Sequence, residues 1–240
     1  MAVVERASSP ALEQGQFEEW WSQQGDWVEP PNRRRGGESG VQRLQRPDGT
    51  LVYAKRQVGH IYRSFLHPWG RPTVLRERAA LKGLSALGVR VPRLIYCGCH
   101  WAGDQGWRAM LISEALEGFI DIVSWYAAGG RERCGEQVHD RLLSEIGATL
   151  ARMNKGRWQH GCLYAKHVFV KVGEGTGDEV SVEVALLDLE KSRRRLTRLQ
   201  AALHDLRQLR RHSSWSAVDW EKLIYGYQAT FGSTIKELQT

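Results

Sequence analysis

Four side chains with reactive or metal-binding groups lie in one part of the chain. His160, Cys162 and His167 share a short stretch, and Asp188 follows in the next segment. A thiol acts as a base only when its pKa is lowered, whereas a carboxylate is a ready ligand for Mg²⁺. Imidazole is a softer ligand than oxygen. For His167, a metal ligand and a structural role both remain open.

Two apolar segments would position these groups. Val168–Val172 directly follows His167, and Val180–Leu187 ends immediately before Asp188. Both have the composition of β-strands. A helix is predicted over Val138–Asn154, which has an apolar stripe at helical spacing and leads into the reactive stretch. The sequence therefore predicts that His167 and Asp188 lie at the ends of strands.

A lysine and a glutamate upstream form a second candidate group. Lys55 lies in the predicted strand Leu51–Gln57, and Glu77 lies in a helix predicted over Val74–Leu87. A glutamate there could pair with the strand lysine. The simpler alternatives are an exposed strand lysine and a carboxylate that favours the helix start through the helix dipole.

The chain before that strand is rich in glycine, including Gly37 and Gly40. Backbone amides of such a segment can cradle phosphate. The glycines do not spell a GxGxxG motif, so an ordinary flexible loop is an equal alternative. The next segment, residues 60–72, has aromatic and basic residues and is predicted to be a loop.

Composition limits the class of protein. The chain has 240 residues and a formal net charge of +7, which fits one domain or one two-lobed domain and favours anionic partners. No recognised nucleic-acid motif accompanies the charge, so nucleic acid is an unlikely partner. The four cysteines form no CxxC pair, and we expect free thiols. No export signal or membrane-spanning run is visible, so we expect a cytoplasmic protein with at most peripheral membrane contact.

The reactive stretch resembles the catalytic loop of protein kinases. In kinases, His-Arg-Asp is followed five residues after the Asp by an Asn. Here Cys162 stands at the position of that Asp, and His167 stands at the position of the Asn. Lys55 resembles the kinase Val-Ala-Ile-Lys lysine, and Asp188 resembles the metal-binding Asp of Asp-Phe-Gly.

Residues 33–212 resemble the lipopolysaccharide core kinase family of the WaaP/InaA type. The resemblance is carried by His160-x-Cys162-x-Tyr164-x-x-His167, by Asp188-Leu-Glu-Lys and by Asp205-Leu-Arg-Gln-Leu. It implies an α+β, protein-kinase-like, two-lobed fold. We expect an N-terminal helical extension over 1–31, a small β-rich N-lobe with one key helix over 32–117, and a mainly helical C-lobe over 118–240.

The resemblance also implies an activity and roles for residues. The expected reaction is transfer of the ATP γ-phosphate, with Mg²⁺, to a heptose or other sugar hydroxyl of the lipopolysaccharide inner core, with peripheral contact to the inner membrane. Asp205 would brace the loop. The implied site comprises the following residues: Gly37, Gly40, Lys55, Glu77 and Glu114 for the nucleotide, His167 and Asp188 for the metal, and His160, Cys162 and Asp188 for catalysis.

Cys162 departs from the family pattern, in which an Asp stands at this position. That Asp accepts the proton of the attacking hydroxyl, and general-base catalysis supplies roughly 10²–10⁴-fold in rate. Phosphoryl transfer gains most of its acceleration from positioning and charge stabilisation. Two readings therefore stay open, namely a kinase with Cys162 in the loop and a catalytically impaired kinase-like regulator or scaffold.

Overall fold

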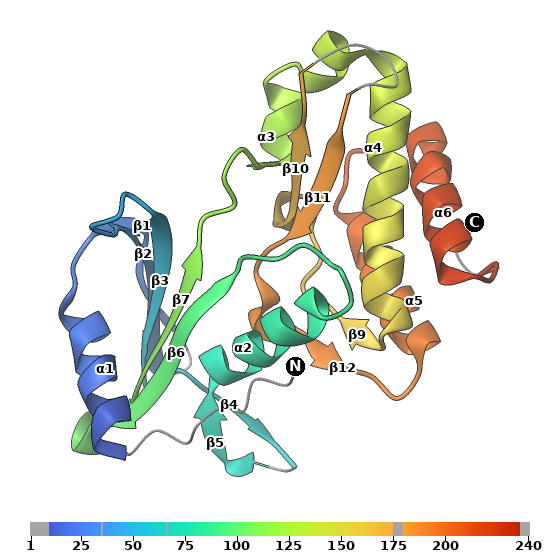
Figure 1. Ribbon diagram of the computed structural model, residues 1–240. Coiled ribbons are helices and arrows are strands. Elements are labelled where there is room, and N and C mark those ends of the chain that lie inside the picture. Colours follow the sequence, from blue (N-terminus) through green and yellow to red (C-terminus); the bar gives the residue numbers. More distant parts are fainter. Residues whose placement is uncertain (1–9, 35, 66, 175–179, 236–240) are drawn as a thin grey trace, which may run out of the picture. The chain divides into compact units, whose positions relative to one another are not determined.

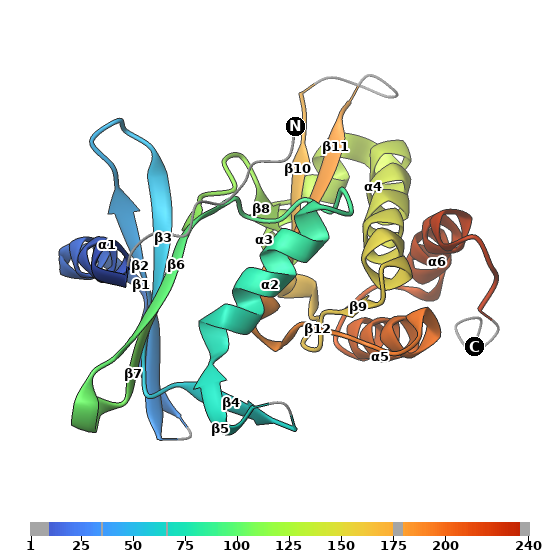
Figure 2. The same cartoon turned by 60° about the horizontal axis from the view of Figure 1, so that its bottom comes forward.

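The computed structural model describes residues 10–34, 36–65, 67–174 and 180–235 (Figure 1). The chain forms two compact units. Unit 1 comprises Met1–Arg78 and Arg93–Ala115, and unit 2 comprises Ala79–Pro92 and Leu116–Thr240. Strands dominate unit 1 and helices dominate unit 2, which confirms the expected α+β class (Figures 1 and 2).

Unit 1 is built on an antiparallel sheet with the strand order β1-β2-β3-β7-β6. Its strands are β1 (Asp26–Arg34), β2 (Gly37–Gln45), β3 (Leu51–Val58), β6 (Leu94–Trp101) and β7 (Trp107–Glu114). Val52 and Ala54 of β3 are fully buried. Because side chains alternate along a strand, Lys55 lies on the opposite face from this core.

Helix α1 (Pro10–Ser22) confirms the helix predicted near the N-terminus, and Phe17 is buried in the sheet core. The helical extension predicted over 1–31 is wrong beyond this helix, because β1 begins at Asp26 and pairs with β2. Residues 1–9 lie outside the described part. The strand β1 contains Pro30 and Pro31, which an edge strand tolerates because one of its sides needs no ladder hydrogen bonds.

The segment predicted to be a loop over 60–72 forms a hairpin instead, of β4 (Ile61–Ser64) and β5 (His67–Pro72). Helix α2 (Thr73–Ser85) follows it directly. The Thr73 hydroxyl donates to Gln57 Oε1 at 2.8 Å, which ties the start of α2 to β3. This contact places Glu77 one turn further along a helix that is fixed to the lysine-bearing strand.

Two long helices of unit 2 pack closely against each other. α4 (Gly130–Lys155) and α6 (Ala217–Phe231) lie side by side (Figure 1). A Cβ atom added at Gly147 of α4 would collide with the backbone of Leu223, and one at Gly226 of α6 would collide with that of Ser144. The two glycines therefore allow the helix backbones to approach closely.

The other elements of unit 2 carry the reactive loop. A sheet with the order β11-β10-β8 packs beside α4, and β9 pairs with β12 (Figure 2). These elements are α3 (Ile122–Ala127), α5 (Arg198–Arg211), β8 (Ile120–Asp121), β9 (Trp158–Gln159), β10 (Val168–Val172), β11 (Val182–Leu186) and β12 (Arg193–Arg194). The predicted strands around His167 and Asp188 are thus confirmed as β10 and β11.

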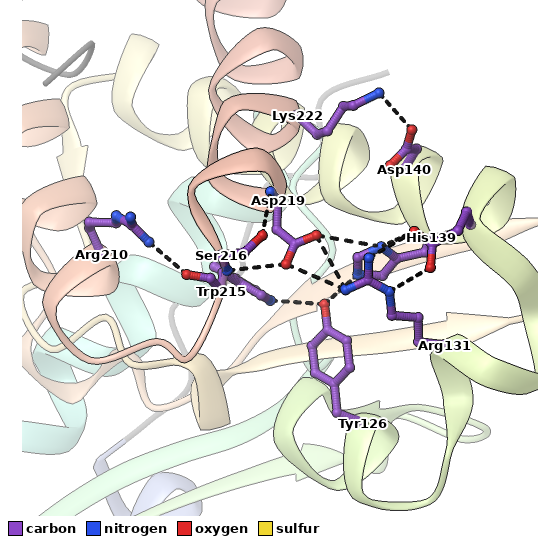
Figure 3. Close-up of polar contacts among 10 residues, drawn as sticks. Tyr126, Arg131, His139, Asp140, Arg210, Trp215, Ser216, Asp219 and Lys222 are labelled. Atoms are coloured by element: carbon purple, nitrogen blue, oxygen red, sulfur yellow. Dashed lines mark hydrogen bonds and ion pairs between the residues drawn. The ribbon is translucent and has the colours of Figure 1, made fainter.

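A polar cluster joins α3, α4 and α6 (Figure 3). The Tyr126 hydroxyl lies 2.6 Å from Nε2 of the fully buried His139 and accepts a hydrogen bond from Trp215 Nε1 at 2.9 Å. Arg131 pairs with Asp219 at 3.4 Å. Asp219 also completes a capping box with Ser216 at the start of α6. The cluster therefore fixes the start of α6 against α3 and α4.

Candidate active site

Lys55 and Glu77 form an ion pair in unit 1. Lys55 Nζ of β3 donates to Glu77 Oε2 of α2 at 2.7 Å, and the two side chains are only 15% and 12% exposed. The predicted pairing is therefore present. A strand lysine held by a helix glutamate is the arrangement that protein kinases need around the nucleotide phosphates.

The two predicted glycine positions differ in their surroundings. Gly37 lines an open pocket of unit 1 together with Gly36, Glu38 and Gly59. Gly40 is buried within β2, and a Cβ atom there would meet the Trp27 ring at 2.7 Å. A Cβ atom at Gly37 would lie 2.6 Å from the backbone of Gly59 and His60, so close packing accounts for both glycines.

Glu114 ends β7, immediately before the chain passes into unit 2. Its carboxylate accepts hydrogen bonds from the guanidinium of Arg93, which lowers the pKa of Glu114. The backbone N–H of Glu114 donates to the carbonyl oxygen of Arg93 at 2.9 Å. Both the side chain and the backbone N–H are therefore engaged within unit 1.

Asp205 of α5 holds the start of the reactive loop in unit 2. Its carboxylate is fully buried and accepts hydrogen bonds from His160 N at 2.8 Å and Gly161 N at 3.1 Å. Asn154 Nδ2 donates to the same carboxylate at 3.0 Å. Gly161 has a φ of 78°, and a Cβ atom there would lie 2.6 Å from the carbonyl oxygen of Lys191. The predicted brace is confirmed.

His160 is fully buried and bonded to the backbone. Its Nε2 lies 2.8 Å from the carbonyl oxygen of Leu187, and because a carbonyl only accepts, Nε2 donates. Burial lowers the pKa of His160, so the ring is neutral near pH 7. This setting suits a positioning residue that orders the turn before Asp188, and it does not suit the catalytic role predicted from the sequence.

Cys162, His167 and Asp188 come together at the end of β11. Their ligand atoms all lie within 4.8 Å of one another. His167 Nδ1 lies 2.7 Å from the carbonyl oxygen of Cys162, and Nε2 lies 3.4 Å from Asp188 Oδ2. Cys162 and His167 are 7% and 8% exposed. The Asp188 side chain is 42% exposed, so it is the member of the group that solvent reaches most easily.

Asp188 has an unusual backbone conformation, with φ 57° and ψ 58° in the left-handed region. Such a conformation costs a non-glycine residue about 1–3 kcal/mol and is concentrated at functional sites. It turns the chain sharply between β11 and the 3₁₀ helix Leu189–Lys191. That helix brings Lys191 Nζ to 3.7 Å from Cys162 Sγ. Sequence reasoning did not single out Lys191 as a residue of the site.

The donor set fits a magnesium ion only in part. Mg²⁺ prefers oxygen ligands, and Asp188 supplies oxygen. His167 supplies nitrogen and Cys162 supplies sulfur, which are softer ligands. Asp188 could therefore hold Mg²⁺ together with oxygens from a nucleotide and from water, whereas Cys162 has no place in such a site.

A strand lysine paired with a helix glutamate, together with a braced loop followed by two strands and an aspartate, defines the protein-kinase-like class of fold. The comparisons with known proteins narrow the class. Residues 18–227 match the Lipopolysaccharide kinase (Kdo/WaaP) family, and the chain belongs to this family.

One sequence relative and one solved structure are similar to the chain. The chain is 40% identical to protein InaA of Escherichia coli (strain K12) over 215 residues, which are 89% of this chain and 96% of that protein. It also resembles the structure of WaaP in complex with acyl carrier protein, with a TM-score of 0.68 and 18% identity, covering 95% of this chain and 89% of that one. This likeness confirms the expected protein-kinase-like fold, and family membership supports a kinase role.

Proposed function

We propose that the protein is an ATP-dependent phosphotransferase that transfers the γ-phosphate to a sugar hydroxyl of the lipopolysaccharide inner core, with a heptose as the first candidate. The observation that carries the proposal is the Lys55–Glu77 ion pair. A partly buried lysine that is already fixed by a carboxylate can bind phosphate oxygens without losing further side-chain freedom. Membership of the lipopolysaccharide kinase family supports the acceptor class.

The remaining roles follow from the local structure of each unit. Lys55 holds the nucleotide phosphates, and Glu77 orients Lys55. Gly37 approaches the phosphates with its backbone, and the backbone carbonyl of Glu114 contacts the adenine. In unit 2, Asp188 holds a metal ion that neutralises charge on the transferred phosphate. His160 and Asp205 position the loop, and neither contacts the substrate.

Calorimetric titration with ATP, with and without Mg²⁺, tests the nucleotide part of the proposal. We expect binding that depends on Mg²⁺ and that weakens in Asp188→Ala. Incubation with γ-labelled ATP and intact or delipidated core then tests transfer to sugar. If the wild-type protein binds no nucleotide under any of these conditions, the proposal is wrong.

The second candidate is a kinase-like regulator or scaffold without turnover. Cys162 favours it, because the thiol occupies the position of the kinase base and is almost fully buried. A protein that binds Mg-ATP but transfers no phosphate to core sugars, water or protein hydroxyls would support this candidate. An ordinary turnover number for the wild-type protein would exclude it.

We also propose that the protein works in the cytoplasm, at the surface of the inner membrane. No helix in the described residues is long and apolar enough to cross a membrane. The β4–β5 hairpin exposes Phe65 and Trp69 almost completely, at 99% and 91%, beside the exposed Arg63 and Arg71. Aromatic and basic side chains together suit the interface of an anionic membrane.

Co-sedimentation with vesicles containing anionic lipid tests the membrane contact. We expect the wild-type protein to sediment with these vesicles and the Phe65→Ser/Trp69→Ser variant to remain in solution. Tyr225→Ser is the matched control, because Tyr225 is an aromatic residue that is 74% exposed on α6. Equal sedimentation of the hairpin variant and this control would show that the hairpin does not make the contact.

A further inference from the structure

The hydrogen bonding of His167 determines which of its nitrogens can bind a ligand. Nδ1 lies 2.7 Å from the carbonyl oxygen of Cys162, and a carbonyl oxygen only accepts. Nδ1 therefore carries a hydrogen and donates it. In the neutral ring, Nε2 then presents a lone pair, and this lone pair lies at the side of Asp188.

His167 Nε2 and Asp188 Oδ2, 3.4 Å apart, are then two acceptors that face each other. Two facing lone pairs repel each other unless a proton or a metal cation lies between them. The pair can therefore share a cation.

Cys162 adds a third donor to this pair. The sulfur, the nitrogen and the carboxylate oxygen all lie within 4.8 Å of one another. Zn–N, Zn–O and Zn–S bonds of about 2.0–2.3 Å place tetrahedral donors roughly 3.3–3.7 Å apart. The His167–Asp188 distance already meets this requirement, and the sulfur has to move by at most about 1.5 Å.

The surroundings of the ring match those of a metal ligand. A metal-binding histidine almost always donates its second N–H to a carbonyl or a carboxylate, which fixes the ring and its tautomer. His167 does this through the backbone carbonyl of Cys162, so one ligand residue orients another. Three protein ligands with a fourth, open position are typical of zinc sites that remain accessible.

We propose that Cys162, His167 and Asp188 form a site for a thiophilic divalent cation, with Zn²⁺ as the first candidate. The bonds formed are from Cys162 Sγ, His167 Nε2 and one Asp188 oxygen to the metal, and the thiol releases its proton to solvent. Such an ion occupies the Asp188 oxygen that a nucleotide-bound Mg²⁺ would use. The site does not rest on the proposed kinase activity, because it needs only residues of unit 2.

Lys191 makes the proposal sharper. Its ammonium group donates to Cys162 Sγ at 3.7 Å and would repel an incoming cation. Lys191→Gln removes the charge and keeps a side chain that can donate a hydrogen bond. This variant should therefore bind the metal more tightly than the wild-type protein, whereas loss of a ligand should weaken binding.

Titration of the full-length protein with Co²⁺ tests the site, because a thiolate bound to Co²⁺ gives a charge-transfer band in the near ultraviolet. We expect one equivalent of Co²⁺ to produce the band. Added Zn²⁺ should replace Co²⁺ and remove the band. Cys162→Ser should abolish the band, and Asp188→Asn should weaken binding about 10-fold or more. Cys134→Ser is the matched control, since Cys134 is a free cysteine of the same unit, and it should leave the band unchanged.

Absence of the band in folded wild-type protein overturns the proposal, as does a band that persists in Cys162→Ser. Circular dichroism establishes that each variant is folded. If Cys162→Ser fails to fold, the opposite effects expected for Asp188→Asn and Lys191→Gln still decide the question. ATP calorimetry on the same preparations separates the two proposals, since a cobalt band without nucleotide binding supports the metal site and contradicts the kinase function.

Discussion

The candidate site residues of unit 1 match the kinase pattern, whereas those of unit 2 match it only in part. In unit 1, Lys55 and Glu77 form the ion pair that the pattern requires. In unit 2, Asp205 holds the loop through two backbone hydrogen bonds and is itself held by Asn154 of α4, but the loop carries Cys162 at the position of the base. The contacts that hold the loop thus match those expected for a kinase, whereas the side chain at the position of the catalytic base is a thiol instead of a carboxylate.

This difference shows that the conformation of a site and its chemical reactivity depend on different residues. The shape depends on buried contacts, such as those of Asp205 and His160, whose loss would expose unpaired donors and acceptors. The polar contact of the Cys162 side chain is with Lys191 and not with the buried carboxylate that holds the loop, so a change of this side chain keeps the hydrogen bonds of Asp205. A kinase-like loop therefore does not by itself establish kinase chemistry, and the two must be tested separately.

The largest effect is expected from Cys162→Asp. A carboxylate at this position can accept the proton of an attacking hydroxyl, and Lys191 lies close enough to balance its charge. We expect phosphate transfer to rise by about 10²–10⁴-fold, the usual contribution of a general base. Single-turnover assays with γ-labelled ATP measure it. Cys162→Asn has the same size without a base, and a rise in that variant would contradict the explanation.

A smaller loss is expected from Lys55→Met, which removes the cation from the unit 1 pair. Electrostatic groups aimed at a transition state contribute about 10²–10³-fold, so we expect transfer to fall about 100-fold and ATP binding to weaken. Lys82→Met on the same helix as Glu77 is the control, because Lys82 is exposed. If both variants behave alike, Lys55 does not hold the phosphates.

Asp205→Asn tests the frame of the loop. An amide nitrogen would then face backbone donors that now bond to a carboxylate, and at least one buried donor would be left unpaired. We expect the free energy of unfolding to fall by about 3 kcal/mol. Urea unfolding measures it. Asp140→Asn is the control, because Asp140 makes an exposed pair with Lys222 that is worth less than about 1 kcal/mol.

The sequence predicted much of the fold, because its clearest signals are local. The predicted strand Leu51–Gln57 corresponds to β3, and α4 follows from its apolar stripe. The strand β1 and the β4–β5 hairpin were missed, because Pro30, Pro31 and the polar, aromatic composition of residues 60–72 resemble loops. Their strands are defined by hydrogen-bonding partners that no local pattern reveals.

For the candidate site, the sequence predicted the identity of the residues more accurately than their roles. It pointed to Cys162, His167 and Asp188, but the tautomer of His167 depends on a backbone carbonyl whose direction cannot be read from residue types. The approach of Lys191 to Cys162 depends on the left-handed conformation of Asp188. Only a three-dimensional structure supplies either relation.

The smallest effect concerns pH and the buried histidines of unit 2. Burial lowers the pKa of His139, His160 and His167. The unfolded chain, in which histidine titrates near its usual pKa of about 6.5, therefore takes up protons before the folded chain does. The stability that the neutral histidines contribute is fully present above about pH 6.5, and it is lost as the pH falls below this value. We expect the urea midpoint to be lower at pH 5 than at pH 7.

His139→Gln sharpens this prediction. The charged and titratable groups that face His139 are Glu136, Asp219, Asp140 and Arg131. The Tyr126 hydroxyl lies 2.6 Å from His139 Nε2 (Figure 3). Glutamine can still form a hydrogen bond with this hydroxyl but cannot be protonated, so the variant should lose less stability on acidification than the wild-type protein. Tyr126→Phe keeps the histidine and removes the hydrogen bond, so it should be less stable at both pH values and keep its sensitivity to acid. Equal acid sensitivity of His139→Gln and the wild-type protein would place the effect on the other two histidines, both of which belong to the reactive loop.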